Sequence, residues 1–344
     1  MVLVADTGRQ GEEYVKNSWE NVQNRMKQDS DLGGVSELRN REAIISAVGT
    51  GGGSGDWGYI NRRSGWADAE ASMRWLRHTV ENTRRVTFLH GEAKRLLKTG
   101  KKVQGAVLKD GRIIEADLVI LATGAWTGKL VDLRGRATAT GQVLAYLDLT
   151  ATEQARLGKM PVLLNMSTGM FIIPPKNKLL KVARHAYGYL NPVTISNPDD
   201  PEEMITVSLP FTTHDDPDLQ APAEGLLACR QALRSIVPSL ADRPFSGSRI
   251  CWYTDTPNGD FLITYHPDFA GLFLATGGSG HGFKFLSVIG DCVVDCVEGN
   301  CPVEFEEKWK WPAERVENVV TEDGSRGGRP GLILREELTK GSRL

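Results

Sequence analysis

The sequence lacks an apolar run long enough to cross a bilayer. Its longest apolar stretches, residues 118–122 and 272–276, have the length of β-strands, whereas a membrane span needs about 20 apolar residues. It also lacks a long basic run, and its formal net charge is −2, so it has no electrostatic footprint for nucleic acid. We therefore expect neither a membrane nor a nucleic acid as a partner.

The sequence also lacks a regular cysteine framework and a signal peptide. An odd number of cysteines without regular spacing favours a reducing compartment. Cys292, Cys296 and Cys301 lie close enough in sequence to suggest three metal ligands. No histidine or fourth cysteine joins them at metal-site spacing, so we interpret them as small buried apolar residues.

The composition is that of an ordinary globular protein, and a length of 344 residues predicts two domains or one large one. Helical periodicity is expected over residues 12–28, 39–48, 67–84 and 223–236. Strand patterns run over 86–89, 93–97, 103–109 and 118–122, and an antiparallel layer is expected over 141–246.

Two glycine-rich strings are candidates for cofactor contact. Residues 272–275 are a strand, 276–282 a glycine-rich turn and about 283–297 a helix, an order that suits anion binding at a helix N-terminus. Residues 53–58 (GSGDWG) match G-x-G-x-x-G literally. Because a loop follows them instead of a helix, we reject them as a dinucleotide fingerprint.

Several blocks together resemble one enzyme family. They are residues 64–69 (SGWADA), 122–126 (ATGAW), 251–257 (CWYTDTP) with 261–263 and 266–267, and 277–285 (GGSGHGFKF). In this order they are similar to monomeric sarcosine oxidase, the fructosyl-amino-acid oxidases and the fungal saccharopine or pipecolate oxidases. The similarity extends over about residues 1–300.

The resemblance implies an α/β (α+β) fold, with a Rossmann-like FAD-binding domain in two parts (66–140 and 249–300) and a mainly antiparallel β substrate domain (141–248). A helical and loop segment on the substrate side (1–65) and a C-terminal tail (301–344) complete the expected division of the chain. It implies FAD-dependent oxidation of the C–N bond of a secondary amino acid to an imine, with O2 reduced to H2O2. Cys251 would bind the flavin covalently as a thioether, and Lys284 and Tyr253 would contact the substrate. The residues expected to line the cofactor are Cys251, Ala93, Thr123, Gly124, Ala125, Trp126, Gly278, Ser279, Gly280, His281, Gly282, Phe283 and Lys284.

Lys181 and His185 resemble a Lys-x-x-x-His pair on a substrate-domain strand of the family. Residues four apart on a strand point to the same face, so both side chains are expected to face the flavin. A cation there would stabilise the negative charge that develops as oxygen is reduced. The surrounding residues 176–188 look closer to the saccharopine, pipecolate and sarcosine-type fungal members than to the fructosyl-amine enzymes.

The sequence departs from the family at its start. The family opens with a βαβ unit that carries G-x-G-x-x-G and a ribose-binding acid, and residues 1–48 contain no equivalent. We therefore interpret the chain as an N-terminally truncated member whose parallel sheet lacks a central strand and has unpaired edges. An incomplete gene model and a catalytically silent remnant both fit, and a flavin dehydrogenase with a protein electron acceptor is a third alternative.

The chain ends in Ser342, Arg343 and Leu344, a variant of the Ser-Lys-Leu peroxisomal address. We expect a peroxisomal import receptor as a partner and a peroxisomal location, with the cytoplasm as the alternative. The small-molecule partners expected are an amine and O2, and the protein is expected to be a monomer.

Overall fold

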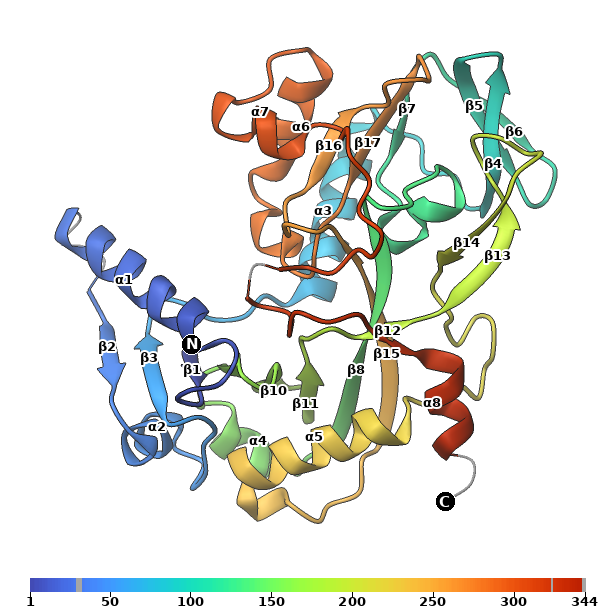
Figure 1. Cartoon of the computed structure of the whole chain (residues 1–344). Helices are drawn as coiled ribbons and strands as arrows, with labels where there is room; N and C mark the ends of the chain where they lie inside the picture. Colours follow the sequence, from blue (N-terminus) through green and yellow to red (C-terminus); the bar gives the residue numbers. More distant parts are fainter. Residues whose placement is uncertain (29–32, 323, 342–344) are drawn as a thin grey trace.

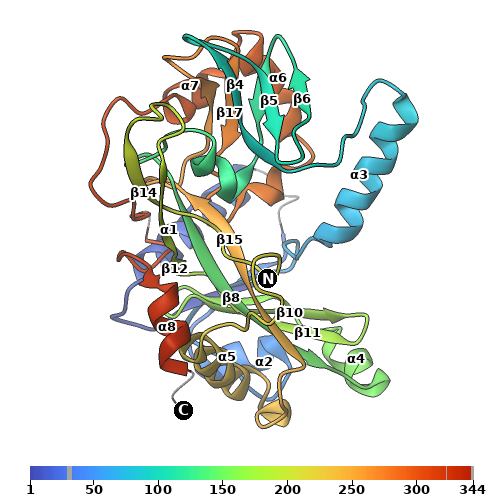
Figure 2. The same cartoon turned by 90° about the vertical axis from the view of Figure 1, so that its right-hand side faces the viewer.

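The computed structural model describes residues 1–28, 33–322 and 324–341. A large sheet with helices beneath it forms the lower part of the view in Figure 1, and three small sheets with their helices form the upper part. The long strands β8 (Thr138–Asp148) and β15 (Gly247–Asp255) pair along nine positions and run from the lower part toward the upper one (Figure 2). The fold class agrees with the prediction of a mixed α/β protein with mainly antiparallel sheets.

The large sheet has the order β18-β12-β8-β11-β10-β9-β1-β3-β2, and β15 pairs with β8 off this path. Its pairs are antiparallel except β1 with β9 and β12 with β18. The other strands of this sheet are β1 (Val2–Ala5), β2 (Val35–Leu38), β3 (Trp57–Asn61), β9 (Leu163–Asn165), β10 (Met170–Lys176), β11 (Leu179–Arg184), β12 (Tyr189–Leu190) and β18 (Leu332–Ile333).

The main core lies between this sheet and helix α5 (Ala223–Ile236). Leu180 and Val182 of β11 and Val143 of β8 pack with Leu233 and Ile236 of α5, and all five are fully buried. Alternate positions on a strand point to opposite faces, so the neighbouring residues of β8 and β11 point away from α5. The sheet therefore has one face closed by α5 and another available for a site.

Shorter helices complete the lower part, and local capping explains where they begin. The Asn40 side chain accepts a hydrogen bond at the start of α2 (Arg41–Val48), and Thr150 and Glu153 form a capping box on α4 (Ala151–Leu157). Helix α1 (Glu12–Gln28) packs on β1 and β3.

In the upper part, a two-stranded sheet pairs β13 (Pro192–Ser196) with β14 (Met204–Ser208).

The upper part contains the remnant of a parallel sheet. Strand β17 (Leu272–Thr276) pairs in parallel with β7 (Val119–Leu121) and antiparallel with β16 (Leu262–Tyr265). A separate sheet holds β4 (Ala93–Thr99), β5 (Lys102–Leu108) and β6 (Ile113–Glu115). The helices of this part are α3 (Ala69–Thr83), α6 (Ile289–Val297) and α7 (Val303–Trp309).

Strand β7 lies at an open edge of its sheet. The sequence predicts a strand buried on both faces, but the side chain of Ile120 is 45% exposed. Helix α3 matches its prediction in position, yet it has no buried residue, and Trp75 is 68% exposed. The parallel sheet therefore has an unpaired apolar edge, as expected from the sequence.

Other predicted elements differ from the structure. Residues 86–89 form no strand, although they belong to the described part of the chain. The segment 1–65 was expected to be helical and loop-like, but β1, β2 and β3 join the large sheet. Strand β1 was missed because VLVA is too short for its pattern to identify it as a strand.

The prediction of a C-terminal tail over 301–344 is also wrong for the described residues. Helix α7 packs against β16, β18 pairs with β12, and α8 (Leu334–Gly341) packs against α5. This segment has little periodicity because its elements are short and add to the edges of existing layers. The tripeptide Ser342-Arg343-Leu344 lies outside the described residues. Among the described residues, no helix combines the length and the apolarity needed to cross a membrane.

Candidate functional site

The predicted catalytic and cofactor side chains share one face of the large sheet. Lys181 lies opposite Tyr146, which lies opposite Gly247 on the other neighbouring strand. Cross-strand partners point to the same face, and so do residues two or four apart on a strand. Cys251 and Tyr253 therefore lie on the Lys181 face, opposite the face that α5 closes.

His185 directly follows β11, and its ring lies against Tyr253, with the ring centroids 5.8 Å apart. Burial, together with the positive charges of Arg326, His281 and Lys284, lowers the pKa of His185 to about 3. The imidazole is therefore neutral at physiological pH. Burial also raises the pKa of Tyr253, so its phenol keeps its proton.

Lys181 lines an open cavity of 530 Å³ together with Tyr146, Trp66 and Asp68. Trp66 and Asp68 belong to the SGWADA block, which the fold brings beside the strand that carries Lys181. Burial lowers the pKa of this lysine. A desolvated amine at the wall of a cavity is an arrangement typical of functional sites.

The two loops predicted to line the cofactor lie side by side. One follows β7 and contains residues 123–126, and the other follows β17 and contains residues 277–282. The hydroxyls of Thr127 and Thr276 lie 3.1 Å apart, and Thr276 donates a hydrogen bond to the carbonyl of Gly124 at 3.4 Å. The carboxyl ends of adjacent parallel strands meet at one edge of a sheet, which is where α/β proteins bind their ligands.

The glycine loop comes close to the strand face. Gly280 has φ +73°, and a Cβ atom there would lie 2.6 Å from the ring of Tyr253, so a larger residue does not fit. A Cβ atom at Gly278 would meet nothing within 4 Å, which leaves open space on that side. The loop thus combines a close approach to the sheet with a free surface.

The helix predicted to begin near Phe283 begins later. Residues Gly282–Phe285 form a single 3-10 turn, and α6 starts at Ile289. The loop therefore has no α-helix N-terminus directly behind it, and the anion-binding argument drawn from the sequence is wrong for this position.

The other predicted residues are distributed around this region. Lys284 and Phe283 lie on the exposed 3-10 turn, and Trp126 is also exposed. Partial burial nevertheless lowers the pKa of Lys284. Ala93 begins β4 and packs against the apolar cluster that includes Leu121 of β7, so it lies beside the loop-bearing strands instead of on the Lys181 face.

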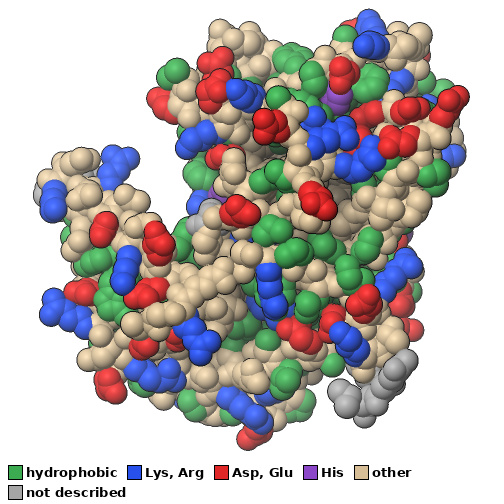
Figure 3. Space-filling view, viewed as in Figure 1, with side chains coloured by type: hydrophobic (Ala, Val, Ile, Leu, Met, Phe, Trp, Pro, Cys, Tyr) green, Lys and Arg blue, Asp and Glu red, His purple; other side chains and the backbone are tan. Residues whose placement is uncertain are grey.

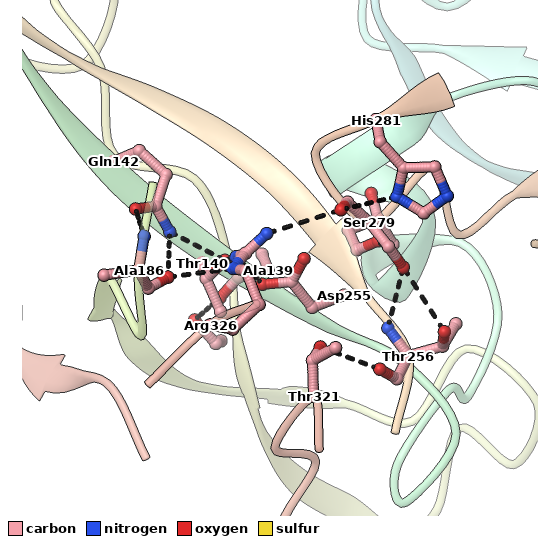
Figure 4. Close-up of polar contacts among 12 residues, drawn as sticks. Ala139, Thr140, Gln142, Ala186, Asp255, Thr256, Ser279, His281, Thr321 and Arg326 are labelled. Carbon is pink, nitrogen blue, oxygen red and sulfur yellow. Dashed lines mark hydrogen bonds and ion pairs between the residues drawn. The ribbon is translucent and has the colours of Figure 1, made fainter. Parts of the chain in front are cut away.

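The sequence analysis missed Arg326, which lies at the centre of the polar contacts in Figure 4. Its side chain is 3% exposed and forms an ion pair of 2.5 Å with Asp255 of β15. The carboxylate of Asp255 also accepts a hydrogen bond from the hydroxyl of Thr140. Buried arginines are almost always paired, but nothing in the low-periodicity sequence around residue 326 indicated that this one is buried.

The glycine string 53–58 and the three neighbouring cysteines both serve packing in the structure. The string 53–58 ends in strand β3, where a Cβ atom at Gly58 would lie 2.2 Å from the carbonyl of Leu3, so this glycine serves strand packing. Cys292, Cys296 and Cys301 pack in the apolar cluster of β16, α6 and α7. Burial raises the pKa of Cys296 to about 12.

A cavity larger than the one beside Lys181 lies in another part of the molecule. Figure 3 shows a notch between the α1 arm and the upper part of the molecule. A cavity of 680 Å³ is lined by α1, Asn61, Arg63, Glu322 and Gly324. Its described lining contains none of the predicted site residues, so it is separate from the Lys181 face.

Four side chains on the Lys181 face retain free hydrogen-bonding capacity. Among the described residues, no hydrogen bond or ion pair engages the side chains of Lys181, His185, Cys251 or Tyr253; Lys181 and Tyr253 contact only aromatic rings or a guanidinium plane. Polar groups that are this buried normally have partners. A cation, a neutral imidazole, a thiol and a phenol thus face a common region as a set of groups available to a ligand.

Comparison with known proteins identifies the family. The profile of the FAD dependent oxidoreductase family (DAO) matches residues 2–296. The chain is 29% identical to the amino acid oxidase imqH of Aspergillus flavus, over 87% of this chain and 73% of that protein. It is 29% identical to the L-saccharopine oxidase of Schizosaccharomyces pombe, over 73% of this chain and 60% of that protein.

The fold agrees with these relatives. The crystal structure of the deglycating enzyme fructosamine oxidase from Aspergillus fumigatus (Amadoriase II) superimposes with a TM-score of 0.78 and 30% identity, covering 90% of this chain and 75% of that one. The match to the saccharopine oxidase spans less than two thirds of that relative's length. With a family profile matched over residues 2–296 and a shared fold, the chain belongs to the FAD-dependent oxidoreductases.

Proposed function

We propose that this protein oxidises the C–N bond of a secondary amino acid to an imine, using FAD, and reduces O2 to H2O2. The observation that carries the proposal is the set of four unpartnered polar side chains on the Lys181 face, next to the glycine loop after β17. The relatives named as amino acid, L-saccharopine and monomeric sarcosine oxidases support an amino acid substrate.

The residues present fit the ring end of a flavin. The thiol of Cys251 is half-buried on the Lys181 face, and the open side of Gly278 leaves room for a planar ring beside the loop. The pyrophosphate end has less support, because the described residues contain no helix that opens on a G-x-G-x-x-G turn. We therefore assign ring contacts to the loops 123–126 and 277–282, and no contacts to the phosphates.

Each side chain then has a role set by its chemistry. Bound FAD would supply the acceptor for the two electrons of the amine and pass them to oxygen. Lys284 and Tyr253 would hold the substrate carboxylate, and neutral His185 would accept a hydrogen bond from the substrate nitrogen. Lys181, a cation without a counter-ion, would stabilise the negative charge that develops on oxygen.

A covalent link through Cys251 is the most direct test. We expect purified full-length protein, reconstituted with FAD, to keep its yellow colour in the protein pellet after acid precipitation. The Cys251→Ser variant should release the colour, whereas Cys229→Ser, which changes a cysteine buried under α5, should retain it. Colour released equally by the wild type and by Cys251→Ser would contradict the covalent link.

A catalytically silent protein is the second candidate. The open edge of β7 and the lack of a phosphate-binding helix among the described residues favour it. A protein that takes up no FAD, measured by equilibrium dialysis against a folded control, would establish this candidate and rule out oxidase activity for this chain. Retention of FAD without peroxide release, but with reduction of an added electron carrier, would instead indicate a dehydrogenase.

We also propose a peroxisomal location through Ser342-Arg343-Leu344, which lie outside the described residues. A fluorescent protein fused to the N-terminus should accumulate in peroxisomes, and deletion of the last three residues should leave it in the cytoplasm. An unchanged distribution after the deletion would refute this location. A monomeric state is proposed alongside it and is measured by light scattering.

A further inference from the structure

Residues 321–322 and 324–333 pass along the candidate site, and we call them the strap. The hydroxyl of Thr321 donates to the carbonyl of Thr256 at 2.9 Å, and the amide of Glu322 donates to that of Pro257 at 3.0 Å. At its other end, the amide of Leu332 donates to the carbonyl of Gly188 at 3.0 Å. Between these anchors the strap places Arg326 inside the protein, with 2% of its surface exposed.

The guanidinium of Arg326 joins three segments that each carry a predicted site residue (Figure 4). Its Nε donates to the carbonyl of Ala186 at 3.0 Å, its Nη1 to that of Ser279 at 3.3 Å, and its Nη2 to the carboxylate of Asp255 at 2.5 Å. Ala186 follows His185, Ser279 lies in the glycine loop, and Asp255 lies two residues after Tyr253. A planar fork with five donors meets all three acceptors at once, which a lysine ammonium cannot do.

Arg326 also sets the charge around His185. It stacks on the ring of Tyr253 at 4.8 Å, and Tyr253 in turn contacts the His185 ring. Its positive charge acts on His185 together with those of His281 and Lys284 from the glycine loop and the turn after it. Asp255 is the carboxylate that balances Arg326.

We propose that Arg326 is a positioning residue: it fixes the His185 segment, strand β15 and the glycine loop relative to one another and places a positive charge beside the His185 ring. The effect of Arg326 on turnover rests on the proposed function. The positioning of the three segments and the charge beside His185, in contrast, are properties of the protein without flavin. They can therefore be measured whether or not the chain binds FAD.

Hydrogen exchange tests the first part. The Arg326→Lys variant keeps a cation but loses the fork, so we expect amide exchange at residues 185–187 and 277–281 to accelerate at least about tenfold, with residues 179–183 of β11 unchanged. The matched control is Arg329→Lys on the same strap, where the arginine stacks on Tyr187 and is expected to leave the glycine loop protected. Equal protection of the loop in Arg326→Lys and the wild type would overturn the positioning role.

NMR titration of the His185 ring tests the second part, with a His185→Gln variant to assign the signal. In Arg326→Met we expect the midpoint of His185 to rise by about one pH unit or more, because a nearby cation disfavours the imidazolium. In Arg326→Lys the midpoint of His185 should stay closer to its wild-type value, because the cation is kept. If Arg326→Met does not fold, Asp255→Asn/Arg326→Met is compared with Asp255→Asn, because these two variants differ only in the cation. An unchanged midpoint in these variants would overturn the electrostatic role.

Discussion

Acidification should destabilise the folded protein through His185. The folded state keeps this ring neutral, since its pKa is lowered to about 3 by burial and by nearby positive charge. In the unfolded chain a histidine titrates near its ordinary value of about 6.5. Between these two pH values the unfolded state binds more protons than the folded state, so the free energy of unfolding decreases as the pH falls.

The size of the effect follows from this gap. A pH of 5 is about 1.5 units below the midpoint of a histidine in the unfolded chain, so that ring is almost fully protonated. In the folded protein the His185 ring is still almost fully neutral at this pH. At about 1.4 kcal/mol per unit, His185 should remove about 2 kcal/mol of stability between pH 7.5 and pH 5. A loss of this size is a large share of the stability of a typical domain.

Urea unfolding of the wild type and of His185→Gln at both pH values measures this contribution. Glutamine does not titrate, so the variant should lose about 2 kcal/mol less than the wild type over the same pH interval, whatever its own stability at pH 7.5. Subtracting the two cancels the contributions of the other titrating groups. Equal losses in the two proteins would refute the assignment of a neutral, buried His185.

Four further substitutions test other parts of the structure. If FAD is retained, Lys181→Met should slow flavin reoxidation by O2 about 10²- to 10³-fold in stopped-flow measurements, and an equal slowing of anaerobic reduction by the amine would contradict its oxygen role. Glu224→Gln breaks the buried pair with Arg184 and should cost about 2 kcal/mol in urea unfolding, less than a fully buried pair because Glu224 is partly exposed; no loss would contradict the pairing. At the open edge of β7, Ile120→Thr should change stability by less than about 0.5 kcal/mol, whereas Leu121→Ala, which opens a cavity, should cost about 2–5 kcal/mol; the reverse order would mean that the edge is covered.

Local pattern was sufficient for the elements with strong periodicity. Helices α1 and α5 have the bounds expected from the spacing of their apolar residues, and β4 and β5 match the strand patterns over 93–97 and 103–109. The same patterns place Lys181 and His185 on one strand face, as period-two alternation requires. Elements of two to four residues, such as β1 and β18, could not be predicted from the sequence, because so few positions do not define a period.

The sequence by itself therefore determined the family, the long strands and helices, and most of the side chains on the Lys181 face, because these depend on contiguous motifs and on local periodicity. Only the tertiary structure decided which face α5 closes, that the loops after β7 and β17 meet, and that Arg326 enters the site from the strap. Arg326 lies 71 residues along the chain from its partner Asp255, and burial of a charge at such a distance depends on packing that no local pattern encodes.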